Sequence, residues 1–139
     1  MGQTMNGFHL PPYARTMGME VDHVEDGGVP VIAMDFAGRV QGRPGFLHGG
    51  AIGGLLEMAA HAALRAELDR QGSAFRIKPI NISIEYLRGG VEERTFARGE
   101  VIRAGRRVAN VRVEAWQGDR TRLVASSWMN FLLAPPKEN

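Results

Sequence analysis

Cysteine is absent from the 139 residues of this chain. Its absence excludes disulfide bonds, thiolate metal sites and a cysteine nucleophile, and it says little about the cellular compartment. Any catalytic group must therefore be an oxygen or a nitrogen. With 44% apolar residues, the chain has enough material for one hydrophobic core and fits the usual size of a single domain.

The sequence also lacks a long apolar run and a long basic run. No stretch is apolar enough to cross a bilayer, and residues 1–12 lack the basic-then-apolar pattern of a signal peptide. We therefore expect a soluble, cytoplasmic protein with no membrane partner. Basic and acidic residues alternate to a net charge of +2, which argues against nucleic-acid binding. The short cluster of Arg103, Arg106 and Arg107 better suits a single polyanionic ligand.

Hydrophobic alternation predicts six strands and one long helix. The expected strands are 19–26, 30–36, 75–87, 95–104, 108–117 and 122–133. Two strands, a helix and four further strands predict an α+β domain, with an antiparallel sheet packed against the helix. We expect this domain to span 19–133. Residues 1–18 are expected to form a loosely packed arm or a short helix, and 134–139 a flexible tail.

The predicted helix is an alanine-rich segment from His48 to about Leu68, and Gly72 lies in the segment that ends it. Alanine has the highest helix propensity, whereas Gly53 and Gly54 each cost roughly 1 kcal/mol in a helix interior. Small residues let another backbone approach closely. The segment therefore favours a central helix that is gripped by a curved sheet.

The segment Gly45-Phe46-Leu47-His48-Gly49-Gly50 leads directly into this helix. The first N–H groups of a helix have no internal partner and lie at the positive end of its dipole, so they can stabilise a carbonyl oxygen that becomes anionic. Gly49 and Gly50 let that oxygen approach closely. Glu57 follows about two and a half turns later, where a carboxylate is costly unless it is solvated at a dimer seam or used. His61 lies on the same face.

Together these features resemble the hot-dog acyl-CoA thioesterases, specifically the PaaI-like group of phenylacetate degradation. The resemblance covers about residues 19–133. It rests on the Gly-x-x-His-Gly-Gly loop at 45–50, the acidic residue nine places after His48, the strand 81–87, and the turn before Arg106-Arg107. It implies a hot-dog fold, a curved antiparallel sheet wrapped around one long helix. It also implies hydrolysis of an acyl-CoA to a free acid and CoA, with no cofactor because CoA is part of the substrate.

The resemblance further implies roles for individual residues. Glu57 would act as nucleophile or as general base on a water, the Gly49 N–H would polarise the thioester carbonyl, and His48 would position the thioester. An aromatic or short- to medium-chain acyl group is expected. The residues expected to bind it are Gln41, Phe46, Gly50, Met58 and His61.

Two positions depart from the family pattern. Members with Glu at this position often carry Ser or Thr four residues later to orient the attacking water, where this chain has His61. The family commonly has Asn or Gln six residues before the His, where this chain has Gly42 beside Gln41. Either a one-residue shift in the loop brings Gln41 into the role of holding the water or carbonyl, or the role is missing.

In the family, CoA lies across the strand ends that follow the helix. The matching residues here are Tyr86, Leu87, Arg88, Gly89, Gly90, Arg103, Gly105, Arg106, Arg107 and Val108. The arginines are the natural phosphate partners, because guanidinium groups form bidentate charge-assisted bonds. A charged hairpin tip is the alternative for 103–107. Active sites of the family are shared between two subunits, so the resemblance requires a homodimer and favours a homotetramer.

Other functions stay open beside this one. A non-hydrolytic acyl-CoA binding or sensor protein fits the irregular Gly42 position. An acyl-thioester dehydratase shares the fold and a His/carboxylate pair, but it needs a different spacing. Ser83 and Ser126 lack the context of a nucleophile elbow, and no His/Asp/Glu spacing predicts a metal site. His9 and His23 are expected to be ordinary surface residues.

Overall fold

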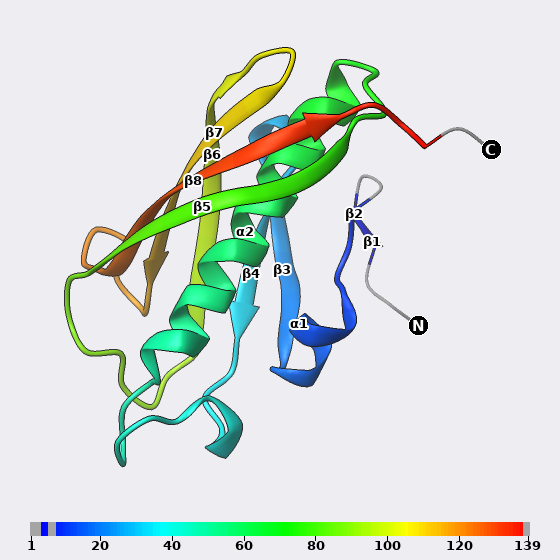
Figure 1. The fold of residues 1–139 in the computed structure, drawn as a ribbon. Coiled ribbons are helices and arrows are strands. Elements are labelled where there is room, and N and C mark those ends of the chain that lie inside the picture. The colour runs from blue at the N-terminus through cyan, green and yellow to red at the C-terminus, as the bar shows by residue number, and fades with distance from the viewer. Residues whose placement is uncertain (1–3, 6–7, 138–139) are drawn as a thin grey trace.

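The computed structural model of the chain describes residues 4–5 and 8–137 (Figure 1). Residues 1–3, 6–7 and 138–139, which belong to the predicted arm and tail, lie outside the described residues. The helices are α1 (Pro12–Thr16) and α2 (Gly49–Arg70), with short 3-10 turns at Asp26–Gly28 and Gly38–Val40. The strands are β1 (Thr4–Met5), β2 (Phe8–His9), β3 (Met19–Glu25), β4 (Val29–Met34), β5 (Arg76–Tyr86), β6 (Thr95–Ala104), β7 (Val108–Trp116) and β8 (Leu123–Ala134).

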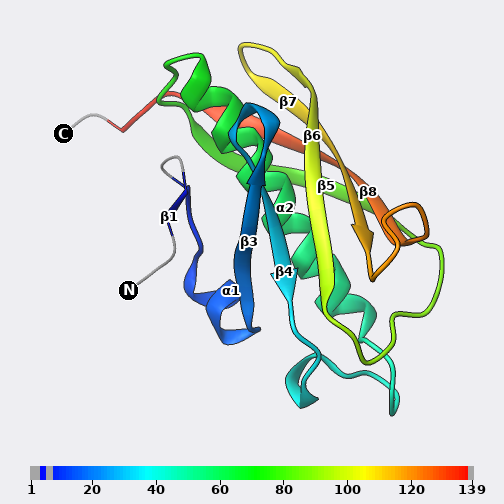
Figure 2. The same cartoon turned by 180° about the vertical axis from the view of Figure 1, so that it is seen from behind.

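Six strands form one antiparallel sheet in the order β3-β4-β6-β7-β8-β5. α2 lies against the inner face of this curved sheet, as the views from the front and from behind both show (Figures 1 and 2). This confirms the expected α+β hot-dog architecture. The six expected strands and the long helix are also confirmed, each within two residues of its predicted ends.

The sheet approaches α2 closely at Gly99 of β6. A Cβ on Gly99 would lie 2.9 Å from the carbonyl oxygen of Ala59 and 2.9 Å from the Cβ of Ala63, which is too short for a real side chain. The buried face of α2 is rich in alanine for the same reason, and Val111 and Val113 of β7 are buried with it in one core. Burial of this face stabilises the helix, because tertiary packing contributes more to a helix in a protein than propensity does.

The chain before β3 contributes to the core. Leu10 and Ala14 are buried, at 3% and 0% exposed, and they belong to the same apolar cluster as α2. Of the two alternatives for this segment, the short helix is therefore present as α1. Tyr13, which also belongs to α1, lies against Gly54 of α2.

β5 is an edge strand, and among the described residues only β8 pairs with it. On the sheet, Asn110 of β7 donates a side-chain hydrogen bond to Asn130 of β8, which donates one of 2.7 Å to Asn81 of β5. This asparagine ladder (Asn110, Asn130 and Asn81) crosses three strands and ends at the edge. Ile80, beside it on β5, is 53% exposed. A long edge strand with an exposed isoleucine offers a surface for another strand.

Candidate active site

His48 caps the start of α2. Its ring Nδ1 accepts a hydrogen bond of 2.8 Å from the Gly50 N–H, so a neutral His48 carries its proton on Nε2, at the opposite side of the ring. The Gly49 N–H has no acceptor among residues 4–5 and 8–137. One N–H at the positive end of the helix dipole therefore has no acceptor in the described part of the chain.

The loop before α2 uses Gln41 for its own closure. The Gln41 Oε1 accepts a hydrogen bond of 2.9 Å from the Gly45 N–H. A Cβ on Gly42 would lie 3.1 Å from the Cα of His48, which leaves little room for a side chain at that position. The amide oxygen of Gln41 thus stabilises the loop, and Gly42 packs against the cap residue.

Glu57 lies in an open pocket of about 430 Å³ between α2, β5 and α1. The pocket is lined by Tyr13, Gly50, Gly53, Gly54, Glu57, Ile82 and Ile84. Glu57 is half-buried, and its carboxylate has no hydrogen bond or ion pair with any part of the chain that the structure describes. A half-buried carboxylate without a partner, beside apolar side chains, is a candidate functional group.

The end of β5 and the residues that follow it lie against the start of α2. The Tyr86 hydroxyl donates a hydrogen bond of 3.0 Å to the Gly49 carbonyl, and the Leu47 N–H donates one of 2.9 Å to the Gly90 carbonyl. Gly89 faces the ring of Phe46 closely enough that a Cβ there would lie 3.2 Å from it. The structure therefore brings these predicted substrate and CoA residues together with the helix start.

A second hollow of about 400 Å³ continues from this segment. It is lined by Arg88, Gly89, Val91, Glu93, Gln117, Gly118, Asp119 and Arg122. The predicted phosphate partner Arg88 is joined there by Arg122, which the sequence reasoning did not select. Arg122 lies in the turn between β7 and β8. This turn comes close to Arg88 because β8 pairs with β5 in the sheet.

The other predicted CoA residues lie elsewhere in the chain. They lie in and beside the β6–β7 turn, beyond the last turns of α2 (Figure 1), and are Arg103, Gly105, Arg106, Arg107 and Val108. Val108 pairs with Leu132, which pairs with Lys78 near the start of β5, whereas Tyr86 ends that strand. At about 3.3 Å per residue, roughly 25 Å of strand separates the two groups. One chain does not bring this turn to its own helix start.

His61 and Met58 lie on the side of α2 that faces the core. The ring of His61 packs edge-to-face on Phe131 with a centroid distance of 4.9 Å, and burial lowers the pKa of His61 below its usual value. Met58 is 7% exposed and belongs to the apolar core. Neither lines the Glu57 pocket, so these two predicted substrate residues are not grouped with Glu57 there.

The pocket contains three side chains that the sequence reasoning missed. Ile82 and Ile84 lie at period two in β5, a pattern that could have marked one strand face as the wall opposite the helix. Tyr13 comes from α1, where no periodicity marks it. The sequence offers an indirect signal for such a ring. A glycine in the helix interior, Gly54, leaves space for a large side chain from another element.

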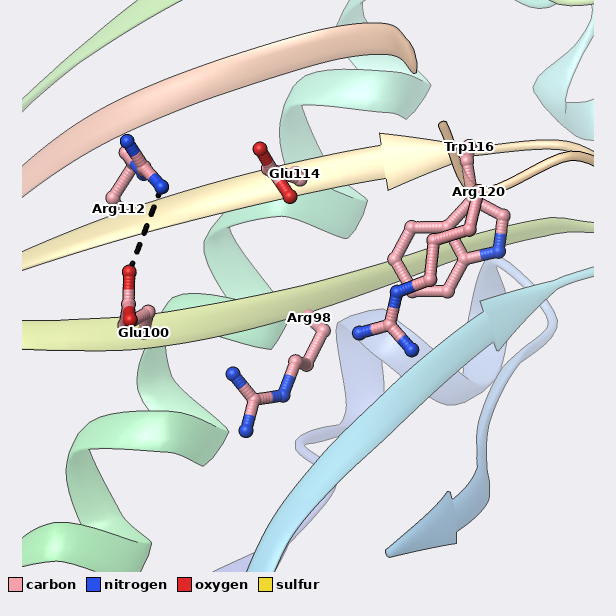
Figure 3. Close-up of a pocket in the computed structure, with 6 residues that line it drawn as sticks. All are labelled: Arg98, Glu100, Arg112, Glu114, Trp116 and Arg120. Carbon is pink, nitrogen blue, oxygen red and sulfur yellow. Dashed lines mark ion pairs between the residues drawn. The ribbon is translucent and has the colours of Figure 1, made fainter. Parts of the chain in front are cut away.

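A third hollow, of about 190 Å³, lies on the sheet over β6 and β7 (Figure 3). Arg112 faces Glu100 across 3.6 Å, and the Arg120 guanidinium lies 4.2 Å from the centroid of the Trp116 ring. Arg120 also binds Glu25, and Arg98 Nε lies 2.9 Å from Glu25 as an ion pair without hydrogen-bond geometry. Opposite charges neutralise one another across this face, so we assign it no chemistry.

Two kinds of feature are missing from the described residues. No group of three His, Cys, Asp or Glu side chains is placed to hold a metal ion. Neither helix is long and apolar enough to span a bilayer.

The curved antiparallel sheet around one long helix defines a hot-dog fold. The sequence profile of the thioesterase superfamily matches residues 44–124, from the loop before α2 into β8. The chain therefore belongs to the thioesterase superfamily, and thioester hydrolysis is the general activity of this class.

Known relatives agree with this assignment. The medium/long-chain acyl-CoA thioesterase YigI of Escherichia coli is 30% identical over 125 residues, which cover 77% of this chain and 76% of the relative. A conserved protein of Pseudomonas aeruginosa has a similar structure, with a TM-score of 0.75, 26% identity, and coverage of 89% of this chain and 94% of that one. A variant of the phenylacetic acid degradation protein PaaI from Thermus thermophilus has a TM-score of 0.70 at 24% identity, covering 88% and 98%, and shares the fold.

Proposed function

We propose that this protein hydrolyses acyl-CoA thioesters to a free acid and CoA. The observation that carries the proposal is a pair of groups on α2 that have no partner in the described chain, the Gly49 N–H and the Glu57 carboxylate. A half-buried carboxylate without a partner is costly, and each of the two groups matches one need of thioester hydrolysis. The proposed acyl group is aromatic or a short to medium aliphatic chain.

The proposed chemistry needs one donor and one base. The thioester carbonyl oxygen accepts a hydrogen bond from the Gly49 N–H, and the helix dipole stabilises the negative charge that develops on it. Glu57 takes a proton from a water, whose oxygen bonds to the carbonyl carbon. The C–S bond then breaks, and the proton passes to the CoA sulfur. In the alternative route, the Glu57 carboxylate attacks directly and water hydrolyses the resulting anhydride.

His48 is the proposed positioning group for the thioester. Because Nδ1 is used by the Gly50 N–H, the exposed Nε2–H can donate to the substrate without loss of the cap. CoA would follow from the helix start along Tyr86–Gly90, with Arg88 and Arg122 near its phosphates.

We propose a site shared between two protomers. About 12 Å of helix separates Gly49 from Glu57 in one chain. An antiparallel pairing of β5 with β5 of a second copy would turn a second helix start toward the pocket. It would also bring the partner's β6–β7 arginine turn toward the CoA path, which explains why one chain holds the predicted CoA residues at two ends. A tetramer and a cytoplasmic location stay predictions.

The first experiment replaces the carboxylate. Purified protein is incubated with a panel of acyl-CoAs and a thiol reagent, and CoA release is followed. Glu57→Gln should reduce kcat by about 10²- to 10⁴-fold, because removal of a positioned base costs that much. Glu67→Gln is the matched control, since Glu67 lies on the same helix and its side chain bonds to Arg70 and Gln71 near the end of that helix. Equal CoA release by the wild type and Glu57→Gln would refute the proposal.

A non-hydrolytic acyl-CoA binder is the second candidate. It is favoured by the loop geometry, because the Gln41 amide oxygen is engaged by the Gly45 N–H and Gly42 carries no side chain. Such a protein would gain thermal stability with acyl-CoA and would leave the ligand intact after long incubation. The dehydratase reading needs a His and a carboxylate at another spacing and has no supporting observation here.

A further inference from the structure

Tyr13 is placed beside the Glu57 pocket by its own short helix. Pro12 opens α1, and the Met17 N–H donates a hydrogen bond of 3.0 Å to the Tyr13 carbonyl. Leu10 and Ala14 anchor the segment in the core, at 3% and 0% exposed. Tyr13 itself is 47% exposed and lines the pocket. The ring therefore has a fixed base and a surface position.

Gly54 is the residue of α2 that receives this ring. A Cβ on Gly54 would collide with the Tyr13 hydroxyl and would lie 3.1 Å from its Cε2. Gly54 precedes Glu57 by three residues, so both lie on one face of the helix. The tyrosine ring and the carboxylate therefore border the same opening.

The opposite wall of the pocket is apolar. It consists of Ile82 and Ile84 of β5, and Ile84 Cδ1 lies near enough to Gly53 that a Cβ there would be 3.1 Å away. A tyrosine ring offers an apolar face to such a space. An apolar chain that passes Glu57 between these walls would meet Tyr13.

We propose that Tyr13 is the specificity-determining wall of the acyl pocket, and that it limits the length of acyl chain the protein accepts. This inference rests on the proposed function, because it assigns the pocket beside Glu57 to the acyl group. One methylene more or less in an apolar pocket changes discrimination by roughly 10- to 200-fold. The position of one aromatic ring is therefore enough to set a length preference.

The test uses acyl-CoA thioethers of graded chain length, which cannot be hydrolysed, with hydrolysis of the matching thioesters measured in parallel. Tyr13→Ala should move the chain length of tightest binding upward, and roughly 10-fold or more affinity should be gained for the first chain that the wild type rejects. Tyr13→Phe should keep the wild-type profile, because it retains the ring. Arg15→Ala, exposed on the same helix, is the matched control and should also keep it.

A coupled pair of variants tests the contact itself. Gly54→Ala should displace the ring and shift the length profile in the wild-type background, and alanine raises helix propensity, so the variant should fold. In the Tyr13→Ala background the same substitution has lost its collision partner. It should then change the binding profile much less, and the two effects should not add.

The results separate the two proposals. An unchanged binding profile in Tyr13→Ala, or additive effects of Tyr13→Ala and Gly54→Ala, would overturn the role of Tyr13 and leave thioester hydrolysis standing. Failure of every thioether to bind would overturn the role of Tyr13 as well. Thioethers that bind with the predicted shift, without turnover of any thioester, would support Tyr13 as the wall and refute hydrolysis.

Discussion

Gly49 is the first residue of α2. At that position the N–H can be removed by a substitution that leaves the other groups of the site in place. Proline is tolerated at the first helical position because the N–H there has no intrahelical acceptor. His48, which precedes it, has φ −70° and ψ 135°, a conformation that a residue before proline readily adopts. The N–H can therefore be deleted without breaking the helix.

We predict that Gly49→Pro lowers kcat by about 10²- to 10³-fold, as expected for loss of one oxyanion donor. Gly49→Ala keeps the N–H, and its Cβ would meet the Tyr86 ring at 3.4 Å, an ordinary contact. That control should stay within a few-fold of the wild type in CoA release. Far-ultraviolet circular dichroism checks that α2 still forms in both variants. Equal loss in the two variants would mean that space at Gly49, rather than its N–H, matters.

His23 illustrates a residue whose charge matters for stability. Its ring bonds to Asp22 at 2.7 Å and to Glu25 at 3.1 Å, and these carboxylates raise the pKa of His23 above its usual 6.5. Arg120 in turn holds the pKa of Glu25 down to about 2. The sequence predicts an ordinary surface histidine at this position. The His23 side chain is indeed exposed, but it belongs to a cluster of charged side chains with Asp22, Glu25 and Arg120.

The direction of the pH effect follows from the raised pKa of His23. Its contribution is fully present below 6.5, the unfolded value, and is lost as the pH rises through the higher folded value. The difference in unfolding free energy between the wild type and His23→Gln should therefore shrink as the pH is raised. Urea denaturation at a series of pH values measures it. A difference that stays constant with pH would contradict the assignment of charge to His23.

At the scale of elements, the contact between α2 and β6 depends on one missing side chain. Gly99→Ala would force a methyl group against the Ala59 carbonyl oxygen, and a backbone atom of a helix cannot move aside cheaply. We predict a loss of about 1–3 kcal/mol in unfolding free energy, the usual cost of overpacking. Gly38→Ala is the control, because a Cβ there meets nothing within 4 Å. A Gly99 variant as stable as the control would show that the helix and sheet can separate easily.

The elements themselves were predictable because each has a local cause. Gly27 and Gly28, with φ of +81° and +78°, turn the chain between β3 and β4 as the glycine pair predicts. Alternation marked the strands, and alanine marked α2. The loop at 45–48 leads directly into α2, and the Gly49 N–H has no acceptor within residues 4–5 and 8–137.

What the sequence could not predict depends on partners that are distant in the chain. Met58 looked like a pocket residue from its neighbours, but an apolar side chain on a helix does not reveal which wall it faces, and here it faces the core. No periodicity in the sequence marks Tyr13 as a pocket residue, because its ring packs on Gly54 of α2, which is distant in the chain. Arg122 joins Arg88 only through the strand order.

At the scale of the whole molecule, the edge strand β5 sets the proposed assembly. Lysine on an edge strand discourages strand pairing. We predict that Ile80→Lys shifts the protein from dimer to monomer in analytical ultracentrifugation and reduces CoA release, because a shared site is lost. Ile102→Lys, at a residue of similar exposure (49%) on β6, should leave both unchanged. A dimer that survives Ile80→Lys, or an active monomer, would refute pairing through β5.

The asparagine ladder has a consequence for such a dimer, because it has a direction. Asn110 donates to Asn130, and Asn130 donates to Asn81, so every amide dipole points the same way across the sheet. A two-fold axis reverses that direction in the second copy. Two ladders that meet at β5 therefore present like ends to each other, and they cannot join into one continuous chain of amides. Each directed chain of amide hydrogen bonds therefore ends at the dimer interface. There, water or backbone groups must complete the hydrogen bonds of the two Asn81 side chains.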